Sequence, residues 1–151
     1  LAILAGGPEL EAITATRDLS DVLGDVPADI FIVDCPPAQA HLDRLAMRAA
    51  DVVFACCEPH RLAIAGAARV LDEAQSIPKP PRCALVLGRM DARRGLDRAA
   101  PALLAGAFGV TVLSIHQDAG LAAALNVGSL PPATGRAAAD VEAIAEWIKR
   151  R

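Results

Sequence analysis

Short apolar runs of strand length alternate along the chain with longer alanine-rich stretches whose apolar residues recur at helical spacing. The runs predict strands at Leu1–Ala5, Ile30–Val33, Asp51–Cys57, Cys83–Leu87 and Val110–Ile115. The longer stretches predict helices at Pro8–Ala15, Asp18–Leu23, Ala38–Ala49, His60–Ser76 and Arg94–Phe108, then one from an Asp118 cap to Leu125 and one from a Thr134 cap to Arg151. Strands separated by helices form a parallel sheet, and strands that are apolar on both faces need helices on both sides. We therefore expect one α/β domain over residues 1–151, with a doubly wound, mostly parallel sheet.

The composition fits a folded domain and excludes several other classes. The chain has 151 residues, of which 54% are hydrophobic, so it can build a core and is too apolar for intrinsic disorder. A net charge of −3 predicts no strong overall attraction to nucleic acid or anionic lipid. The four cysteines form no C-x-x-C pair, which argues against a zinc or iron–sulfur site and suits a cytoplasmic protein with reduced thiols. The stretch His60–Ser76 offers Leu62, Ile64, Val70 and Leu71 as core contacts, and the stretch Arg94–Phe108 carries Leu96, Leu103 and Leu104.

The ends of the expected strands carry the chemistry. In an open α/β sheet, ligands bind beyond the carboxyl ends of the strands. The residues that follow the strands at that edge are Asp34, Glu58, Gly88–Asp91 and His116–Asp118. Asp34 comes directly after an apolar run, a position from which a carboxylate can hold Mg²⁺ through water. A strand that simply ends in a polar turn gives the same local pattern.

The segment 29–68, DIFIVDCPPAQAHLDRLAMRAADVVFACCEPHRLAIAGAA, resembles the middle of ParA/MinD-type P-loop ATPases. The likeness lies in a D-x-P-P step at Asp34–Pro37, an A-A-D-x-V strand at Ala49–Val53, a polar-Pro step at Glu58-Pro59 and an A-x-x-G helix at Ala63–Gly66. The downstream segments LVLGRMDARRGL and the chain from Val110 onward resemble the last strands and helices of the same family.

This resemblance implies a partitioning or positioning ATPase, which binds ATP and Mg²⁺ and forms a homodimer on ATP binding. Such proteins position plasmids, chromosomes or other cargo, and a ParB-like or other partner stimulates them. By the resemblance, Asp34 is the catalytic carboxylate that holds Mg²⁺ through water, and the adenine lies between Arg89 and Met90 on one side and His116 and Gln117 on the other. The family often has Asn or Thr where this chain has Gly88-Arg89, and Pro-Arg where it has His116-Gln117.

The largest departure from the family is a missing phosphate cradle. A Gly-rich loop that ends in Gly-Lys-Ser/Thr normally binds the phosphates, and here the only lysines are Lys79, between prolines, and Lys149, in the last helix. We therefore expect the chain to be the C-terminal two-thirds of the ATPase domain, incomplete at its N-terminus and weak in ATP binding by itself. Two alternatives stay open: a non-catalytic α/β scaffolding or protein-binding domain that uses the same rim, and another ATPase of the superfamily, such as a bacterial tyrosine kinase or a cellulose-synthesis accessory ATPase.

Basic residues suggest a further partner. Arg93, Arg94 and Arg98 cluster near the start of one helix, which would suit non-specific DNA binding through phosphates. A solvated basic face is the alternative, because Asp91 and Asp97 are interleaved with the arginines.

The last helix could in principle bind a membrane. It carries Val141, Ile144 and Ile148 on one face, but Glu142 and Glu146 would be repelled by anionic lipid. We therefore expect a closing helix that packs on the sheet and does not bind a membrane.

Overall fold

The computed structural model describes residues 18–35, 40–130 and 132–150. Its elements in chain order are α2 (Leu19–Gly24), α3 (Ala40–Ala49), β1 (Val52–Cys57), α4 (Arg61–Gln75), β2 (Arg82–Met90), α5 (Gly95–Phe108), β3 (Thr111–His116), α6 (Ala119–Asn126) and α7 (Arg136–Lys149). The strand expected at Leu1–Ala5 and the helix expected at Pro8–Ala15 lie outside the described residues. The alternation of strands and helices from β1 onward is confirmed.

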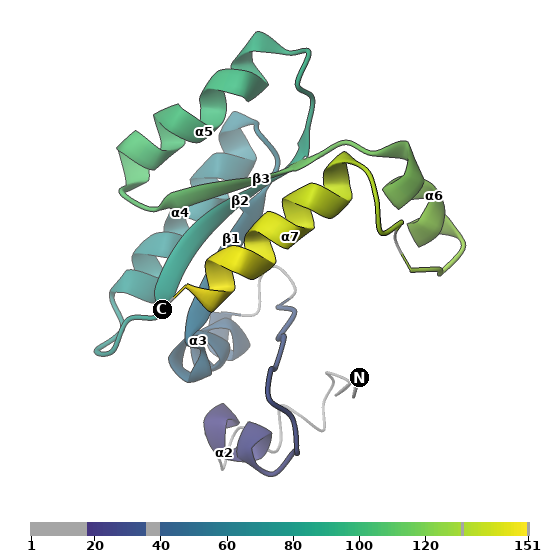
Figure 1. The fold of residues 1–151 in the computed structure, drawn as a ribbon. Helices are drawn as coiled ribbons and strands as arrows, with labels where there is room; N and C mark the ends of the chain where they lie inside the picture. The colour runs from purple at the N-terminus through teal and green to yellow at the C-terminus, as the bar shows by residue number, and fades with distance from the viewer. Residues whose placement is uncertain (1–17, 36–39, 131, 151) are drawn as a thin grey trace.

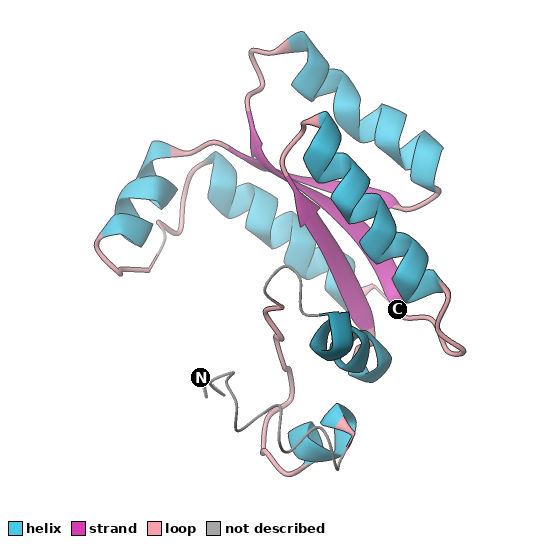
Figure 2. Ribbon diagram, turned by 180° about the vertical axis from the view of Figure 1, so that it is seen from behind, coloured by secondary structure: helices cyan, strands magenta, loops and turns pink. Residues whose placement is uncertain are grey.

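The described strands form an open parallel sheet in the order β1-β2-β3. The register pairs Val52 with Arg82 and Ala84 with Thr111, and it shifts near the end of β2 between Leu87 and Met90. Helix α4 connects β1 to β2, and α5 connects β2 to β3. Figures 1 and 2 show α4 and α7 on opposite sides of this sheet. The α/β class and the parallel sheet are therefore confirmed.

The core lies between the sheet and the α4/α5 layer. Its buried members are Ala55, Ala67, Leu71, Leu85, Leu87 and Met90, with Ala100, Leu104 and Phe108 of α5 packed against them. Leu71 is a core residue as expected, at 2% exposure, whereas Leu62 is 81% exposed. Residues nine apart lie on opposite faces of a helix with 3.6 residues per turn, so Leu62 and Leu71 cannot both face the sheet.

Helix α5 faces the core with a stripe that leaves two of its three leucines exposed. Leu96 and Leu103 are 85% and 68% exposed, and the helix instead buries Asp97. The inward stripe runs from Asp97 through Ala100 to Leu104, at the i, i+3, i+7 spacing of a single helix face. Of the three leucines of α5, Leu104 is therefore the one that packs against the core.

The strand expected at Ile30–Val33 is also wrong, because the structure has no regular element there. Ile30 is 77% exposed and Ile32 92% exposed, and the described part of the sheet pairs β1 only with β2. An apolar run becomes a strand only beside a partner that takes its backbone hydrogen bonds. Among the described residues, no such partner lies beside this segment.

Helix α7 covers the face of the sheet opposite α4 (Figure 1). The Trp147 ring lies 5.5 Å from the Phe54 ring of β1, and the Arg82 guanidinium of β2 lies 4.3 Å above the indole. Arg82 also donates a hydrogen bond to the Trp147 carbonyl at 3.1 Å. The last helix is thus anchored to two strands, as expected of a closing helix.

The face and the start of α7 differ from expectation. Val141 and Ile148 are 52% and 41% exposed, so the sheet-facing stripe does not run through them. Thr134 is not the cap, because Gly135 holds that position and makes no side-chain capping hydrogen bond. In the described part of the chain, no helix is both long enough and apolar enough to cross a membrane.

Candidate functional site at the carboxyl edge of the sheet

A bulge at the end of the central strand directs Arg89 toward the neighbouring strand β1. Between Leu87 and Met90, β2 gains one residue relative to β3, and Arg89 adopts a left-handed φ of 55°. The Arg89 guanidinium Nη1 lies 3.0 Å from Oε1 of Glu58, the residue that follows β1. This left-handed backbone is unfavourable for a residue with a side chain and marks the rim as a strained position.

Two residues expected near the adenine line one cavity. Met90, 3% exposed, and His116 border a space of about 380 Å³ beside the ends of β2 and β3. Its full lining is Met90, Ala92, Asp97, Arg98, Pro101, Ser114, His116 and Arg136. Arg89 and Gln117 do not line it, although the Gln117 amide donates to the Met90 carbonyl at 3.0 Å. The sheet therefore brings Met90 and His116 together and leaves the other two outside.

His116 is held by an acid on the last helix. Asp140 Oδ2 of α7 accepts the backbone N–H of His116 at 2.8 Å and lies 2.9 Å from its ring nitrogen Nδ1. Both side chains are largely buried, at 19% and 17% exposure. The pair joins the end of β3 to α7 and fixes the orientation of the imidazole at the cavity wall.

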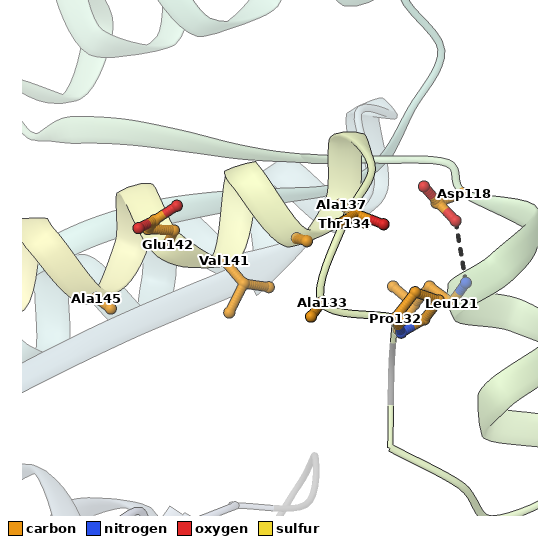
Figure 3. Close-up of a pocket in the computed structure, with 10 residues that line it drawn as sticks. Asp118, Leu121, Pro132, Ala133, Thr134, Ala137, Val141, Glu142 and Ala145 are labelled. Carbon is orange, nitrogen blue, oxygen red and sulfur yellow. Dashed lines mark hydrogen bonds between the residues drawn. The ribbon is translucent and has the colours of Figure 1, made fainter.

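Asp118 links the beginnings of α6 and α7. Its carboxylate accepts the backbone N–H of Leu121 at 3.0 Å and caps α6, as expected. Hydrogen bonds from the amides of Leu121, and then of Ala137 and Gly120, hold the pKa of Asp118 below its ordinary value despite partial burial. Figure 3 shows Asp118 and Leu121 at one end of a second cavity, of about 410 Å³, that continues along α7 past Val141. This cavity is lined mainly by small apolar side chains and lacks converging ionisable groups.

The expected DNA-binding arginines are exposed but engaged locally. The Arg93 guanidinium donates to both carboxylate oxygens of Asp91, at 3.0 and 3.2 Å, and Arg94 lies 3.9 Å from the same carboxylate. Arg98 donates to the carbonyl of Ala92 at 3.0 Å. The hydrogen bonds from Arg93 are the main reason that the pKa of Asp91 is held below its ordinary value. Asp91 therefore offsets part of the positive charge of this cluster.

Asp34 lies near β1 on an irregular, exposed segment. Burial raises the pKa of the Cys56 thiol, and the Asp34 charge raises it further, which places this carboxylate close to the carboxyl half of β1. The pKa of the Cys35 thiol is also raised, chiefly by burial and to a smaller extent by the negative charges of Asp43 and Asp34. Asp43 has a buried Oδ1 without a hydrogen-bond partner in the described structure.

These residues fit the Mg²⁺–ATP group only in part. A lone exposed carboxylate suits a cation that keeps its waters and is otherwise bound by phosphates. The described residues, however, contain no group of three or more His, Cys, Asp or Glu that could hold a metal ion. The sequence also has no Gly-Lys-Ser/Thr loop for the phosphates. The described residues therefore supply no metal-ligand cluster, and the sequence supplies no Gly-Lys-Ser/Thr loop for phosphates.

Several residues of the rim were missed in the sequence. Asp140, Arg136, Ser114 and the buried Asp97 were not predicted to belong to the site. Asp140 could have been noticed, because it interrupts the sheet-facing stripe of α7 between Ala137 and Ile144. Nothing in the local sequence links Arg136 or Asp97 to the end of β3, since only the packing of α5 and α7 brings them there.

The fold and the rim define an α/β protein with a parallel sheet and a small cavity, lined by both polar and apolar side chains, at the carboxyl edge of that sheet. The chain matches no protein-family model, no curated protein and no solved structure.

Proposed function

We propose that this chain is the larger part of a ParA/MinD-type ATPase domain, with a doubly wound P-loop-like sheet, that acts in plasmid, chromosome or cargo positioning in the cytoplasm. The observation that carries the proposal is the shared cavity of Met90 and His116. These residues end two neighbouring strands, and the resemblance assigns both to the adenine. A volume of about 380 Å³ suits a small ligand or a base.

The exposed segment before Asp34 supports the same proposal. Val33 is 47% and Phe31 39% exposed, and β1 has a second edge without a described strand. A segment that is apolar on both faces is expected to be covered on both faces in the working protein. In our proposal, a further strand with the phosphate-binding loop lies between this segment and β1, and Asp34 then holds the water shell of Mg²⁺.

Partners belong to the proposal as well. ATP binding forms a homodimer, and a ParB-like or other protein stimulates hydrolysis. DNA would be bound through Arg93, Arg94 and Arg98, whose guanidinium groups stay exposed despite their bonds to Asp91 and to backbone carbonyls. Phosphate contacts of this kind are weakened by salt, so DNA affinity should fall steeply as the salt concentration rises.

The decisive experiment is Asp34→Ala in a protein that carries the phosphate-binding loop, with Mg²⁺-dependent ATP hydrolysis as the readout. We expect a loss of turnover of at least about tenfold, since the carboxylate orients the metal. Asp29→Ala is the matched control, because Asp29 is a neighbouring exposed acid on the other side of the apolar run. Unchanged turnover in Asp34→Ala would reject the role of this carboxylate.

A second candidate is a non-catalytic scaffolding or protein-binding domain. The exposed apolar run Ile30–Val33 favours it, because such surfaces commonly bind a partner protein. Titration of the 151-residue chain with ATP and Mg²⁺ bears on both candidates. Micromolar affinity would show that the missing loop is not required for nucleotide binding, and would speak against the scaffold.

A further inference from the structure

The face of α5 that points away from the core is apolar along its length. Its exposed residues include Leu96, Ala99, Ala102, Leu103, Gly106 and Ala107. Arg98, at the margin of this face, donates a hydrogen bond to the Ala92 carbonyl at 3.0 Å. Helix α4 lies in the same layer (Figure 2), but its exposed residues include Arg61, Arg69, Asp72 and Gln75. A helix that is apolar on all sides is normally covered on all sides, so the outer face of α5 calls for a partner.

Gly106 lies on this face, and nothing in the described part of the chain requires a glycine there. A Cβ placed on Gly106 meets no atom within 4 Å, and Gly106 is not among the glycines with a positive φ. Inside a helix, glycine is less favourable than alanine, because it loses more backbone freedom on folding. A glycine does, however, let another backbone approach closely. Gly106 is therefore explained by a contact with a second chain.

The outward residues have the spacing of a seam between two helices. Leu96, Ala99, Leu103 and Gly106, which we call the outer stripe of α5, follow each other at intervals of three, four and three residues. Each leucine in the stripe is followed by a small residue. This alternation makes the stripe complementary to a copy of itself that runs in the opposite direction.

The complementarity is clearest for a two-fold axis at the level of Pro101. In that arrangement, Leu96 lies opposite Gly106 of the second copy, and Ala99 lies opposite Leu103 of the second copy. Every layer then holds one leucine and one small residue, so all the layers have a similar volume and can pack without voids. A parallel pair would instead place leucine on leucine and small residue on small residue, which overfills some layers and leaves others empty.

The charges near α5 agree with the antiparallel arrangement. Ala102 and Ala107 flank the outer stripe, so no like charges meet beside it. Arg93 and Arg94 precede the helix and are exposed. An antiparallel partner brings the end of its own α5 beside these arginines. The free carbonyl groups at the end of a helix carry partial negative charge and attract cations.

We infer that the outer stripe of α5 joins two copies of this chain as an antiparallel helix pair, without any nucleotide. The inference does not rest on the proposed function. Two such stripes bury on the order of 1,000 Å² in total, which is the range of weak and transient complexes. The dimer should therefore have a dissociation constant in the upper micromolar range. A lipid surface fits less well, because the alanines and the glycine add little apolar area for insertion.

The test is sedimentation velocity of the 151-residue chain over a micromolar concentration series, without ATP or Mg²⁺. Gly106→Leu puts leucine opposite Leu96 in two layers, and the overpacking should weaken the dimer at least about tenfold. The fold of each copy should be unchanged, because the space around Gly106 is open. Gly66→Leu is the matched control: Gly66 is an exposed glycine of α4 whose Cβ would also meet nothing within 4 Å, and the variant should associate like the unchanged protein.

An exchange of residues separates this packing from unspecific apolar association. Leu103→Ala leaves small residues on both sides of two layers and should weaken the dimer. The double variant Ala99→Leu/Leu103→Ala again places one leucine in each of these layers, so the affinity should return to within about threefold of the original. Unspecific association would depend on the apolar area alone, and Ala99→Leu by itself would then strengthen the dimer. Far-UV circular dichroism checks that each variant folds.

Dimerisation that is lost in Gly106→Leu and recovered in the exchange would support the inference. A monomer at every concentration, or a dimer that forms only with ATP and Mg²⁺, would overturn it. A dimer that Gly106→Leu leaves unchanged or strengthens would also overturn it, since another surface, such as Ile30–Val33, would then be responsible. Binding of the monomer to phosphatidylglycerol vesicles that Leu103→Glu abolishes would assign the stripe to lipid and reject the dimer.

Discussion

Replacing Trp147 with alanine tests whether α7 is held on the sheet by one side chain. The indole is partly buried between Phe54, at 5.5 Å, and the Arg82 guanidinium, at 4.3 Å. Its removal forfeits roughly 100–150 Å² of buried apolar contact, or about 3 kcal/mol at ~25 cal/mol per Å². The aromatic pair adds about 0.5–1.5 kcal/mol and the cation–π contact about 0.5–1 kcal/mol. Because these contributions overlap, we expect a loss of about 3–5 kcal/mol in the free energy of unfolding.

The assay is urea unfolding followed by far-UV circular dichroism, since Trp147 is the only tryptophan and its fluorescence is lost in the variant. Val141→Ala is the matched control on the same helix, because Val141 is 52% exposed and should cost less than about 1 kcal/mol. A loss below about 1 kcal/mol for Trp147→Ala, or one equal to that of the control, would show that α7 does not depend on this anchor.

Three further predictions concern the core, the bulge and the cap. Leu85→Ala should lower the free energy of unfolding in urea by about 3–5 kcal/mol, because Leu85 is fully buried. Leu103→Ala should lower it by less than about 0.5 kcal/mol, because Leu103 is 68% exposed. Similar losses of free energy in the two variants would contradict the observed buried face of α5. Arg89→Gly should raise the free energy of unfolding by up to about 1 kcal/mol. The substitution relieves a left-handed backbone that costs about 1–2 kcal/mol, and it removes an exposed ion pair that contributes at most ~1 kcal/mol. A lower free energy of unfolding would show that the contact with Glu58 dominates. Asp118→Ala should lower the melting temperature at neutral pH. The difference in melting temperature from the unchanged protein should shrink as the pH falls through the lowered pKa of Asp118, because the cap needs the ionised carboxylate. A difference that stays constant into acid would contradict this prediction.

The elements from β1 to α7 could be predicted from local pattern because each carries its own signal. The run before Glu58, the Asp118 cap and the long periodic stretch of α4 all have the expected type and nearly the expected bounds. Ile30–Val33 carried an equally clear strand signal and failed. A strand depends on hydrogen bonds from a neighbour that lies elsewhere in the chain, and periodicity contains no information about that neighbour.

The residues of the candidate site were likewise predictable from the sequence only in part. The parallel order of strands and helices was enough to predict that Met90 and His116 would lie at one edge of the sheet. It could not predict Asp140, because the contact across 24 residues exists only once α7 packs on β3.

The amino-acid sequence by itself thus determined the α/β alternation, the parallel sheet and the edge at which polar residues collect, because these follow from short-range periodicity and from the geometry of crossover connections. The tertiary structure alone decided which face of α5 and α7 is buried, which acid orients the His116 ring, and that Arg89 turns toward Glu58. Those features depend on how helices rotate and dock against the sheet, and many rotations satisfy the same apolar pattern until side chains from distant parts of the chain meet.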